Sequence, residues 1–158
     1  MDKIGTEGTS LSQVHHIGVV VKDINKAIEH FQALGIGPFE ALPKQAGDST
    51  VKEAIHRGKP YTGKTIIRLA QVGPLKIELL QHVSGESINK EFLQSRGEGI
   101  SHLGFLVDDL DSQIDNLTGK GFDPIFLVRH SHGGGGAFFD TSEVGGFLIE
   151  LYQPPPTK

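Results

Sequence analysis

The chain has 158 residues, which is enough for one compact domain or for two small modules that share a core. It has no cysteine, which excludes disulfides and thiolate metal sites, and a net charge of -4 without a basic tract, which argues against a nucleic-acid partner. No apolar run reaches the length of about 18 residues that a membrane span needs, and the polar segment 1–13 lacks the apolar core of a signal peptide, so we expect a cytoplasmic protein with no membrane partner.

Two stretches of the chain resemble each other, and the first begins at Val14. It reads VHHIGVVVKDINKAIEHFQALGIGPF, and the second, from Ile100, reads ISHLGFLVDDLDSQIDNLTGKGFDPI. Four matched pairs lie 86 residues apart: His16 and His102, Gly18 and Gly104, Asp23 and Asp109, and Pro38 and Pro124. Because two copies are too few for a solenoid, the repeat predicts two paired modules.

Each copy begins with a short β-branched run that is typical of a strand and ends at an aspartate. Apolar residues then recur at i, i+4 and i+7, which predicts one face of an amphipathic helix. The first helix is expected to begin at Asp23 or Asn25 and to end at Gly35, and the second to begin at Asp109 or Asp111 and to end at Gly121.

Further strand-like segments follow each helix, at 49–56, 65–72 and 75–82 in the first half and at 124–129, 137–140 and 147–153 in the second. A short connecting helix is expected between the halves. The fold class that these elements predict is α+β, with two paired βαβββ modules. The expected domain covers 14–154, divided into a first module at 14–83, a connection at 84–99 and a second module at 100–154, with tails at 1–13 and 155–158.

A second echo closes each half, KIELLQ at 76–81 and LIELYQ at 148–153. It matches Glu78 with Glu150, 72 residues apart, so the first half carries 14 extra residues, which we expect within 45–63. Side chains alternate along a strand, so His16 shares a face with Gly18 and lies opposite His15, which we expect to pack within its own module.

The repeated histidines and glutamates predict a metal site. A single histidine in a strand is commonly a packed core residue, and a single glutamate on an edge strand is commonly solvated, but a charge in an apolar strand is costly unless it is paired or bound to metal. The proposed ligands are His16, Glu78, His102 and Glu150, and we expect a curved mixed sheet to bring them together. Two imidazoles and two carboxylates without sulfur suit one divalent ion of Zn, Co, Mn, Ni or Fe.

On these residues the chain resembles the vicinal oxygen chelate superfamily, which includes glyoxalase I, methylmalonyl-CoA epimerase, extradiol dioxygenases and antibiotic-resistance proteins. The segments GEGISHLGFLVDDLD and GGFLIELYQ look most like methylmalonyl-CoA epimerase. The resemblance implies that the four residues are metal ligands, that Glu150 and Glu78 are the catalytic carboxylates, and that the protein forms a homodimer.

Two departures from the epimerase pattern concern Glu78 and the strand before it. The position of Glu78 is often Gln in epimerases, whereas Glu is also the bacterial glyoxalase I pattern. Some epimerases carry a second carboxylate on the preceding strand, where this chain has Arg68, and Glu53 is the other candidate for that role. Arg68 is therefore interpreted either as a ligand for a substrate carboxylate or as a solvent-facing strand residue.

The segment RHSHGGGG at 129–136 is interpreted in two ways. It is either a flexible turn between strands or a loop near the site in which Arg129, His130 or His132 contacts the phosphates of a thioester carrier. It lacks the lysine and the following helix of a P-loop. The turn-rich segment HRGKPYTGK at 56–64 is expected to be an exposed loop.

The function predicted from these residues is a metal-dependent isomerase that abstracts a proton next to a metal-bound carbonyl, most like methylmalonyl-CoA epimerase. One alternative is a glyoxalase I-like lyase (lactoylglutathione lyase), which Glu78 favours. Another is a non-catalytic protein that binds a small molecule or antibiotic, against which the complete ligand set counts. A dioxygenase is disfavoured, since its facial triad of ligands leaves more open positions. The expected partner is a small carbonyl or thioester substrate.

Overall fold

The computed structural model describes residues 11–42 and 51–157. Its strands are β1 (Val14–Val20), β2 (Glu40–Ala41), β3 (Val51–His56), β4 (Lys59–Pro60), β5 (Lys64–Val72), β6 (Leu75–Ser84), β7 (Gly99–Leu106), β8 (Pro124–His130), β9 (Gly135–Phe139) and β10 (Leu148–Gln153). Its helices are α1 (Ile24–Ala33), α2 (Ile88–Arg96) and α3 (Leu110–Gly119). None of these helices has the length and apolar character that a membrane span requires. Residues 1–10 of the expected N-terminal tail, positions 49 and 50 of the strand expected at 49–56, and position 158 lie outside the described residues.

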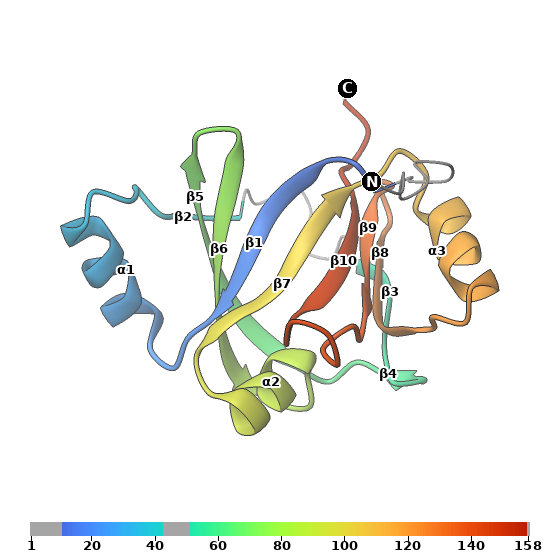
Figure 1. The fold of residues 1–158 in the computed structure, drawn as a ribbon, viewed down its shortest axis with the longest axis horizontal. Helices are drawn as coiled ribbons and strands as arrows, with labels where there is room; N and C mark the ends of the chain where they lie inside the picture. Colours follow the sequence, from blue (N-terminus) through green and yellow to red (C-terminus); the bar gives the residue numbers. More distant parts are fainter. Residues whose placement is uncertain (1–10, 43–50, 158) are drawn as a thin grey trace, which may run out of the picture.

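The strands form one curved sheet in the order β2-β5-β6-β1-β7-β10-β9-β8-β3-β4 (Figure 1). The order β1-β6-β5-β2 in the first half repeats as β7-β10-β9-β8 in the second. In each half the first strand pairs in parallel with the last, and β1 and β7 join the halves as antiparallel neighbours. This arrangement confirms the predicted α+β class and the two paired βαβββ modules.

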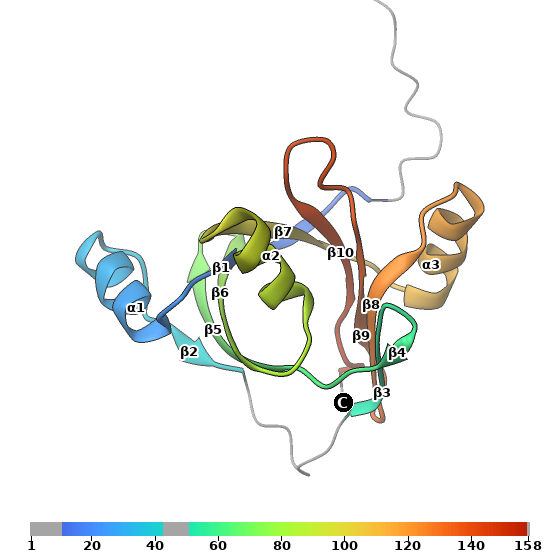
Figure 2. The ribbon, with the colours of Figure 1, turned by 90° about the horizontal axis from the view of Figure 1, so that it is seen from below.

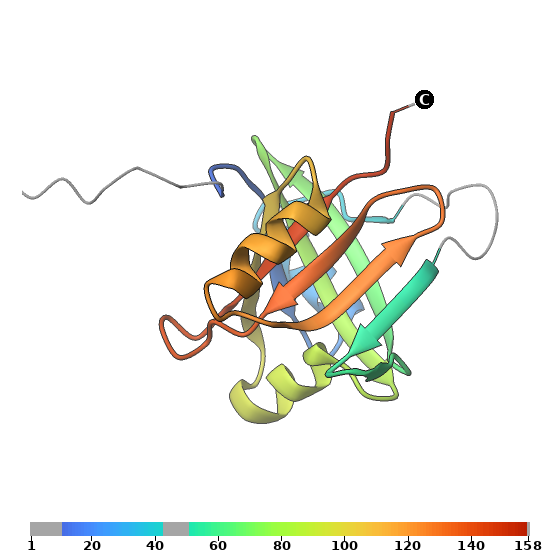
Figure 3. The same ribbon diagram turned by 90° about the vertical axis from the view of Figure 1, so that its right-hand side faces the viewer.

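The strand expected at 49–56 does not pair with its own half. Its described part, β3, pairs antiparallel with β8 of the second module, and the adjoining β4 pairs with β3 (Figure 3). The fourth strand of the first module is instead the two-residue β2 beside β5. The β3–β4 hairpin lies within 45–63, the segment predicted to contain the 14 extra residues, so we interpret it as an insertion that extends the sheet of the other half.

The helix ends follow the repeated sequence. The carboxylate of Asp23 caps α1 by accepting from the backbone amides of Asn25 and Lys26, and that of Asp109 caps α3 by accepting from the backbone amide of Ser112. Gly35 and Gly121 follow the two helices at φ 87° and 91°, which is the left-handed conformation that favours glycine. Asn25 and Asp111, the alternative caps, lie inside the helices.

Helices α1 and α3 cover the outer, convex face of the sheet, one over each module (Figures 1 and 3). Val21, Ile24 and Leu79 form a core under α1, and an equivalent core under α3 includes Leu110 and Leu151. The apolar stripes predicted from the i, i+4, i+7 spacing therefore face the sheet. Since both helices pack on the outer face, neither of them covers the inner face of the half-barrel.

Helix α2 lies inside one end of the curved sheet, which curls around it when seen from below (Figure 2). Phe92 packs on Val20 and Leu80 of the first module, and Ile88 packs on Phe138 and Leu148 of the second. The connecting helix therefore contacts the inner faces of both halves and fills this end of the half-barrel with apolar side chains.

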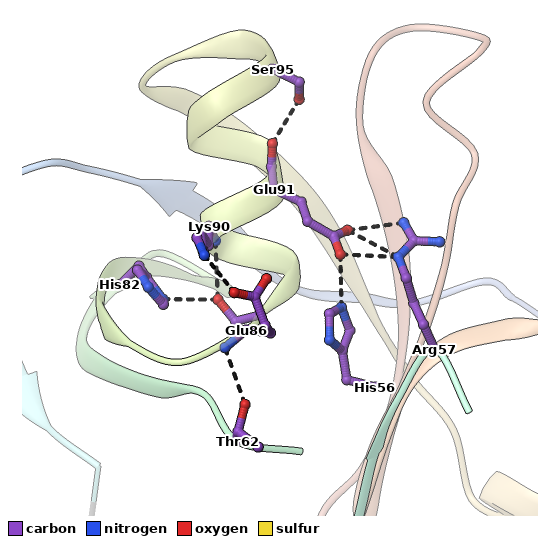
Figure 4. A network of polar contacts seen from close by, with 9 residues as sticks. His56, Arg57, Thr62, His82, Glu86, Lys90, Glu91 and Ser95 are labelled. Carbon is purple, nitrogen blue, oxygen red and sulfur yellow. Dashed lines mark hydrogen bonds and ion pairs between the residues drawn. The ribbon is translucent and has the colours of Figure 1, made fainter. Parts of the chain in front are cut away.

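A network of polar side chains ties the inserted hairpin to α2 (Figure 4). Arg57 donates to both carboxylate oxygens of Glu91, through Nε at 3.0 Å and Nη2 at 2.9 Å, and His56 Nε2 lies 3.0 Å from Glu91 Oε1. The hydrogen bond from Arg57 lowers the pKa of Glu91 below its ordinary value. The sequence predicted that the segment 56–64 is an exposed loop. His56 is only 8% exposed, so this prediction is wrong for the first residue of the segment.

The Glu91→Gln variant is expected to lose about 0.5–1 kcal/mol of unfolding free energy at neutral pH, because the charged pair is partly exposed. A carboxyl with a lowered folded pKa stabilises the fold fully above its ordinary pKa of 4.5, and this contribution is lost as the pH falls through the folded value. The difference between wild type and variant should therefore vanish in acid. Urea unfolding at a series of pH values measures it, and a difference that is constant down to strongly acidic pH would contradict the assignment.

Candidate metal centre

The strand register brings the four predicted ligands to one place on the inner face of the sheet. His16 on β1 is paired with Gly104 on β7, and His102 on β7 is paired with Gly18 on β1. On the flanking parallel strands, Glu78 is paired with Gly18 and Glu150 with Gly104. Each module therefore contributes one histidine and one glutamate to two adjacent rows of the sheet.

The functional atoms of these side chains point toward one another. The two Nε2 atoms of His16 and His102 are 3.1 Å apart, and Glu150 Oε2 lies 2.6 Å from the first and 3.1 Å from the second. The carboxylate of Glu78 lies 4.0 Å from His16 Nε2 and 3.7 Å from His102 Nε2. All four residues thus surround one point, although they are up to 134 positions apart in sequence.

Burial and neighbouring charges shift the pKa values of Glu78 and Glu150 in opposite directions. Burial raises the pKa of Glu78, and the nearby imidazoles only partly oppose this effect. Burial also disfavours the charge of Glu150, but hydrogen bonds from His102 and His16 outweigh it and hold the pKa of Glu150 below its ordinary value. Burial opposes the charge of His16 as well, yet the hydrogen bond to Glu150 prevails and the pKa of His16 is raised.

The second nitrogen of each imidazole also has a partner. His102 Nδ1 lies 3.2 Å from Ser101 Oγ, which lies 3.3 Å from the backbone oxygen of Gly18. If Ser101 donates to that oxygen, it accepts from His102 Nδ1–H. In the neutral form of His102 that binds a metal, Nε2 then carries no proton and its lone pair is directed toward the centre. His16 Nδ1 lies 2.9 Å from His15 Nδ1. Both histidines are therefore oriented by a second contact.

Strand alternation predicted that His15 packs on the face of the sheet opposite His16. The structure contradicts this prediction. The register shifts between Val14 and His16, so His15 is the extra residue of a β-bulge. Its ring lies 4.8 Å from that of Tyr152, which in turn lies 5.9 Å from His16. The bulge interrupts the alternation and brings His15 into contact with a predicted ligand.

We expect the Ser101→Ala variant to bind a divalent ion about 10- to 100-fold more weakly than the wild type. Ser101 is 2% exposed, and the change removes only its hydroxyl, so His102 loses its orienting partner while the packing is kept. Competition with a fluorescent chelator measures the affinity, with Ser112→Ala on the surface of α3 as control. An affinity equal to the wild type would show that the hydroxyl does not orient His102.

The centre has two unlike sides along the strands. Toward α2 the next residues on the inner face of β1, β6 and β10 are Val20, Leu80 and Leu148, which are 0%, 4% and 8% exposed. On the other side the corresponding strands carry Lys76 on β6 and Tyr152 on β10, both partly exposed, together with the bulged His15. The residues on the α2 side of the four ligands are therefore buried, whereas those on the Lys76 and Tyr152 side are partly exposed. Sequence analysis did not single out either residue, although Lys76 shares the strand face of Glu78.

Arg68, predicted as a possible substrate-binding residue, is not brought to the centre. It is paired with Leu79, whereas Glu78 is paired with Leu69, so Arg68 lies on the outer face of the sheet, and its Nη1 donates to the backbone oxygen of Ile67. The register of the β5–β6 hairpin fixes this orientation. The prediction that Arg68 binds a substrate carboxylate is therefore wrong. The alternative is left, in which Arg68 is a strand residue outside the site.

Arg129 is likewise on the outer face. Its guanidinium pairs with Glu53 at 3.1 Å and with Asp111 of α3, which packs outside the sheet. This placement overturns the expectation that Arg129 contacts substrate, and it also removes Glu53 as a candidate for the second base. The two residues form a surface ion pair between the inserted hairpin and the second module.

His132 lies in the loop between β8 and β9, where its Nδ1 is 2.9 Å from the backbone oxygen of Gly133. Its ring stacks on that of His130 with centroids 5.4 Å apart. Substrate contact by His132 stays a prediction.

The donor set fits a divalent ion. His16, Glu78 and His102 each offer a ligand atom within 4.8 Å of the others, and Glu150 Oε2 lies against both imidazoles. Donors that sit about 2.0–2.2 Å from one ion are separated by roughly 3–4.4 Å, which matches most of these distances. Buried imidazoles held through Nδ1, with carboxylates beside them, are donors that suit a Zn-type ion.

Comparison with known proteins extends this picture. The family model described as Glyoxalase/Bleomycin resistance protein/Dioxygenase superfamily matches residues 15–139. The uncharacterized protein YqjC of Bacillus subtilis is 26% identical over 147 residues, which cover 91% of this chain and 94% of YqjC. Methylmalonyl-CoA epimerase from Mycobacterium tuberculosis is 26% identical with a TM-score of 0.65, over 94% of this chain and 92% of that chain. Streptomyces coelicolor methylmalonyl-CoA epimerase in complex with 2-nitronate-propionyl-CoA is 21% identical with a TM-score of 0.65, over 93% of this chain and 100% of that chain, and shares the fold.

Proposed function

The chain belongs to the glyoxalase/bleomycin resistance protein/dioxygenase superfamily, and we propose that it is a divalent-metal-dependent isomerase that abstracts the proton next to a thioester carbonyl, like methylmalonyl-CoA epimerase. The observation that carries the proposal is the convergence of His16, Glu78, His102 and Glu150 on one point of the inner face. The similarity to the Mycobacterium tuberculosis epimerase over 94% of the chain supports it.

In this proposal the four side chains hold one ion, which when bound acts as a Lewis acid on a carbonyl oxygen and makes the neighbouring C–H bond more acidic. Glu150 and Glu78 both lie within 4.0 Å of His16 Nε2, so either carboxylate is placed to accept and return a proton beside the centre. Apolar residues on the α2 side exclude water from the rear of the site. A substrate carbonyl enters from the side of Lys76 and Tyr152.

Proton exchange in D2O tests the proposal. Protein reconstituted with metal is mixed with methylmalonyl-CoA, and proton NMR follows the C2 proton against a metal-only control. Exchange that depends on the protein and disappears with chelator is expected. Protein with bound metal that gives no exchange above the control would reject the epimerase assignment.

A glyoxalase I-like lyase is the second candidate, because the ligand position on β6 holds Glu78 rather than Gln. Its substrate is the adduct of a thiol and a 2-oxoaldehyde, and its chemistry begins with the same proton abstraction. The hemithioacetal of glutathione and methylglyoxal, assayed with the same protein, separates the two candidates. Inactivity toward both substrates, with metal bound, would favour the third prediction, a non-catalytic binding protein. The homodimer and the cytoplasmic location stay predictions, and light scattering on the purified protein tests the first.

A further inference from the structure

We propose that Lys76 is the anion-binding residue of the site and selects substrates that carry a free carboxylate beside the reacting carbonyl, as a malonyl-type thioester does. This inference rests on the proposed function and deepens it by assigning a residue to the substrate's second acidic group.

The first support is the position of Lys76. The parallel register pairs Lys76 on β6 directly with His16 on β1, and Lys76 precedes Glu78 by two residues on the same strand face. Two residues along a strand correspond to roughly 6–7 Å, so the lysine stands one layer from Glu78, in the row of His16, on the partly exposed side of the ligands.

The second support is that this charge has no partner. Among the described residues Lys76 takes part in none of the ion pairs, since Glu78 and Glu150 face the imidazoles instead. Of the described lysines only Lys76 and Lys90 are partly buried, and Lys90 pairs with Glu86. A half-buried ammonium that is left unpaired beside a reaction centre is suited to pair with an anion from the substrate.

The third support is the chemistry of the surrounding side chains. On the same side of the ligands are the phenol of Tyr152 and the imidazole of His15, whose rings lie 4.8 Å apart and which can both donate a hydrogen bond. Donors and one cation therefore face an incoming ligand on this side, whereas Val20, Leu80 and Leu148 line the other.

The test compares Lys76→Met with Arg68→Met in the metal-loaded protein. The first variant removes the ammonium but keeps an unbranched stem, and the second removes a cation from the outer face of the neighbouring strand. Calorimetry with malonate should give a dissociation constant about 10- to 100-fold higher for Lys76→Met and an unchanged value for Arg68→Met. In the exchange assay with methylmalonyl-CoA, the loss should appear mainly in KM.

Malonate binding that is absent from the wild type, or equal in wild type and Lys76→Met, would overturn the inference. Free coenzyme A, which has phosphates but no acyl carboxylate, separates the two possible anions. A loss of coenzyme A binding in Lys76→Met without a loss of malonate binding would assign the lysine to phosphate and also overturn the proposal. Malonate calorimetry needs no turnover, so Lys76-dependent binding without proton exchange would reject the epimerase function while keeping the carboxylate site.

Discussion

Replacement of His102 by Ala is expected to abolish both metal retention and turnover, and replacement of Glu150 by Gln, which keeps an oxygen donor but no base, to weaken metal binding and abolish turnover. His102 is 1% exposed and Glu150 is 8% exposed, and each faces the other and His16 across the boundary between the modules. Loss of a ligand from a set of four leaves too few donors for tight binding, and loss of a proton-transferring carboxylate alone lowers turnover by about 10²–10⁴-fold. Metal content after gel filtration and the rate of C2 proton exchange measure the two effects.

Matched controls lie on the surface of α1, where His30 and Glu29 are exposed. His30→Ala and Glu29→Gln should retain metal and activity at wild-type levels. Circular dichroism checks that each variant is folded. Full metal occupancy in both His102→Ala and Glu150→Gln would show that the ion, if there is one, binds elsewhere.

Substitution of Gly18 or Gly104 by Ala is expected to be nearly as damaging, although neither residue has a side chain to contribute. A Cβ on Gly18 would lie less than 3.0 Å from three ring atoms of His102, and a Cβ on Gly104 would meet the ring of His16 in the same way. Each imidazole therefore lies flat over the glycine of the neighbouring strand. A methyl group there must displace the ring, so we expect metal affinity to fall by about 100-fold or more, since even loss of a supporting contact costs about 10- to 100-fold.

Gly119→Ala is the control for these variants, because nothing lies within 4 Å of a Cβ at that position of α3. It should be neutral or slightly stabilising, since alanine favours helix more than glycine does. Chelator competition compares the three proteins. An unchanged metal affinity in Gly18→Ala and Gly104→Ala would mean that the histidines are not held by the strand contact seen here.

The internal repeat made the core of the site predictable. His16 and His102 occupy equal positions of two copies, and Glu78 and Glu150 close them, so the fold's approximate twofold repetition brings the four together without any knowledge of distances. The equal spacing of the two copies also matched Gly18 with Gly104. The role of these glycines follows only from the antiparallel register, which sets each glycine opposite the other module's histidine.

Other features of the structure depend on the register in which the strands pair, which the predictions from sequence did not include. The turn at Gly73–Pro74 pairs Val72 with Leu75, and counting back along β5 from this pair puts Arg68 opposite Leu79 and outside the site. This turn signal was present in the sequence and would have corrected the prediction for Arg68. The pairing of β3 with β8 and the bulge at His15 are tertiary effects, because they arise where two distant strands meet and leave no local pattern.

Anomalous diffraction from crystals grown with Zn²⁺ or Co²⁺ tests the central claim most directly. The account predicts one strong peak per chain, within bonding distance of His16 Nε2, His102 Nε2 and the carboxylates of Glu78 and Glu150. A peak bound elsewhere, or none at this point although the ion is present in the crystal, would contradict the claim that the two halves of the chain share one metal.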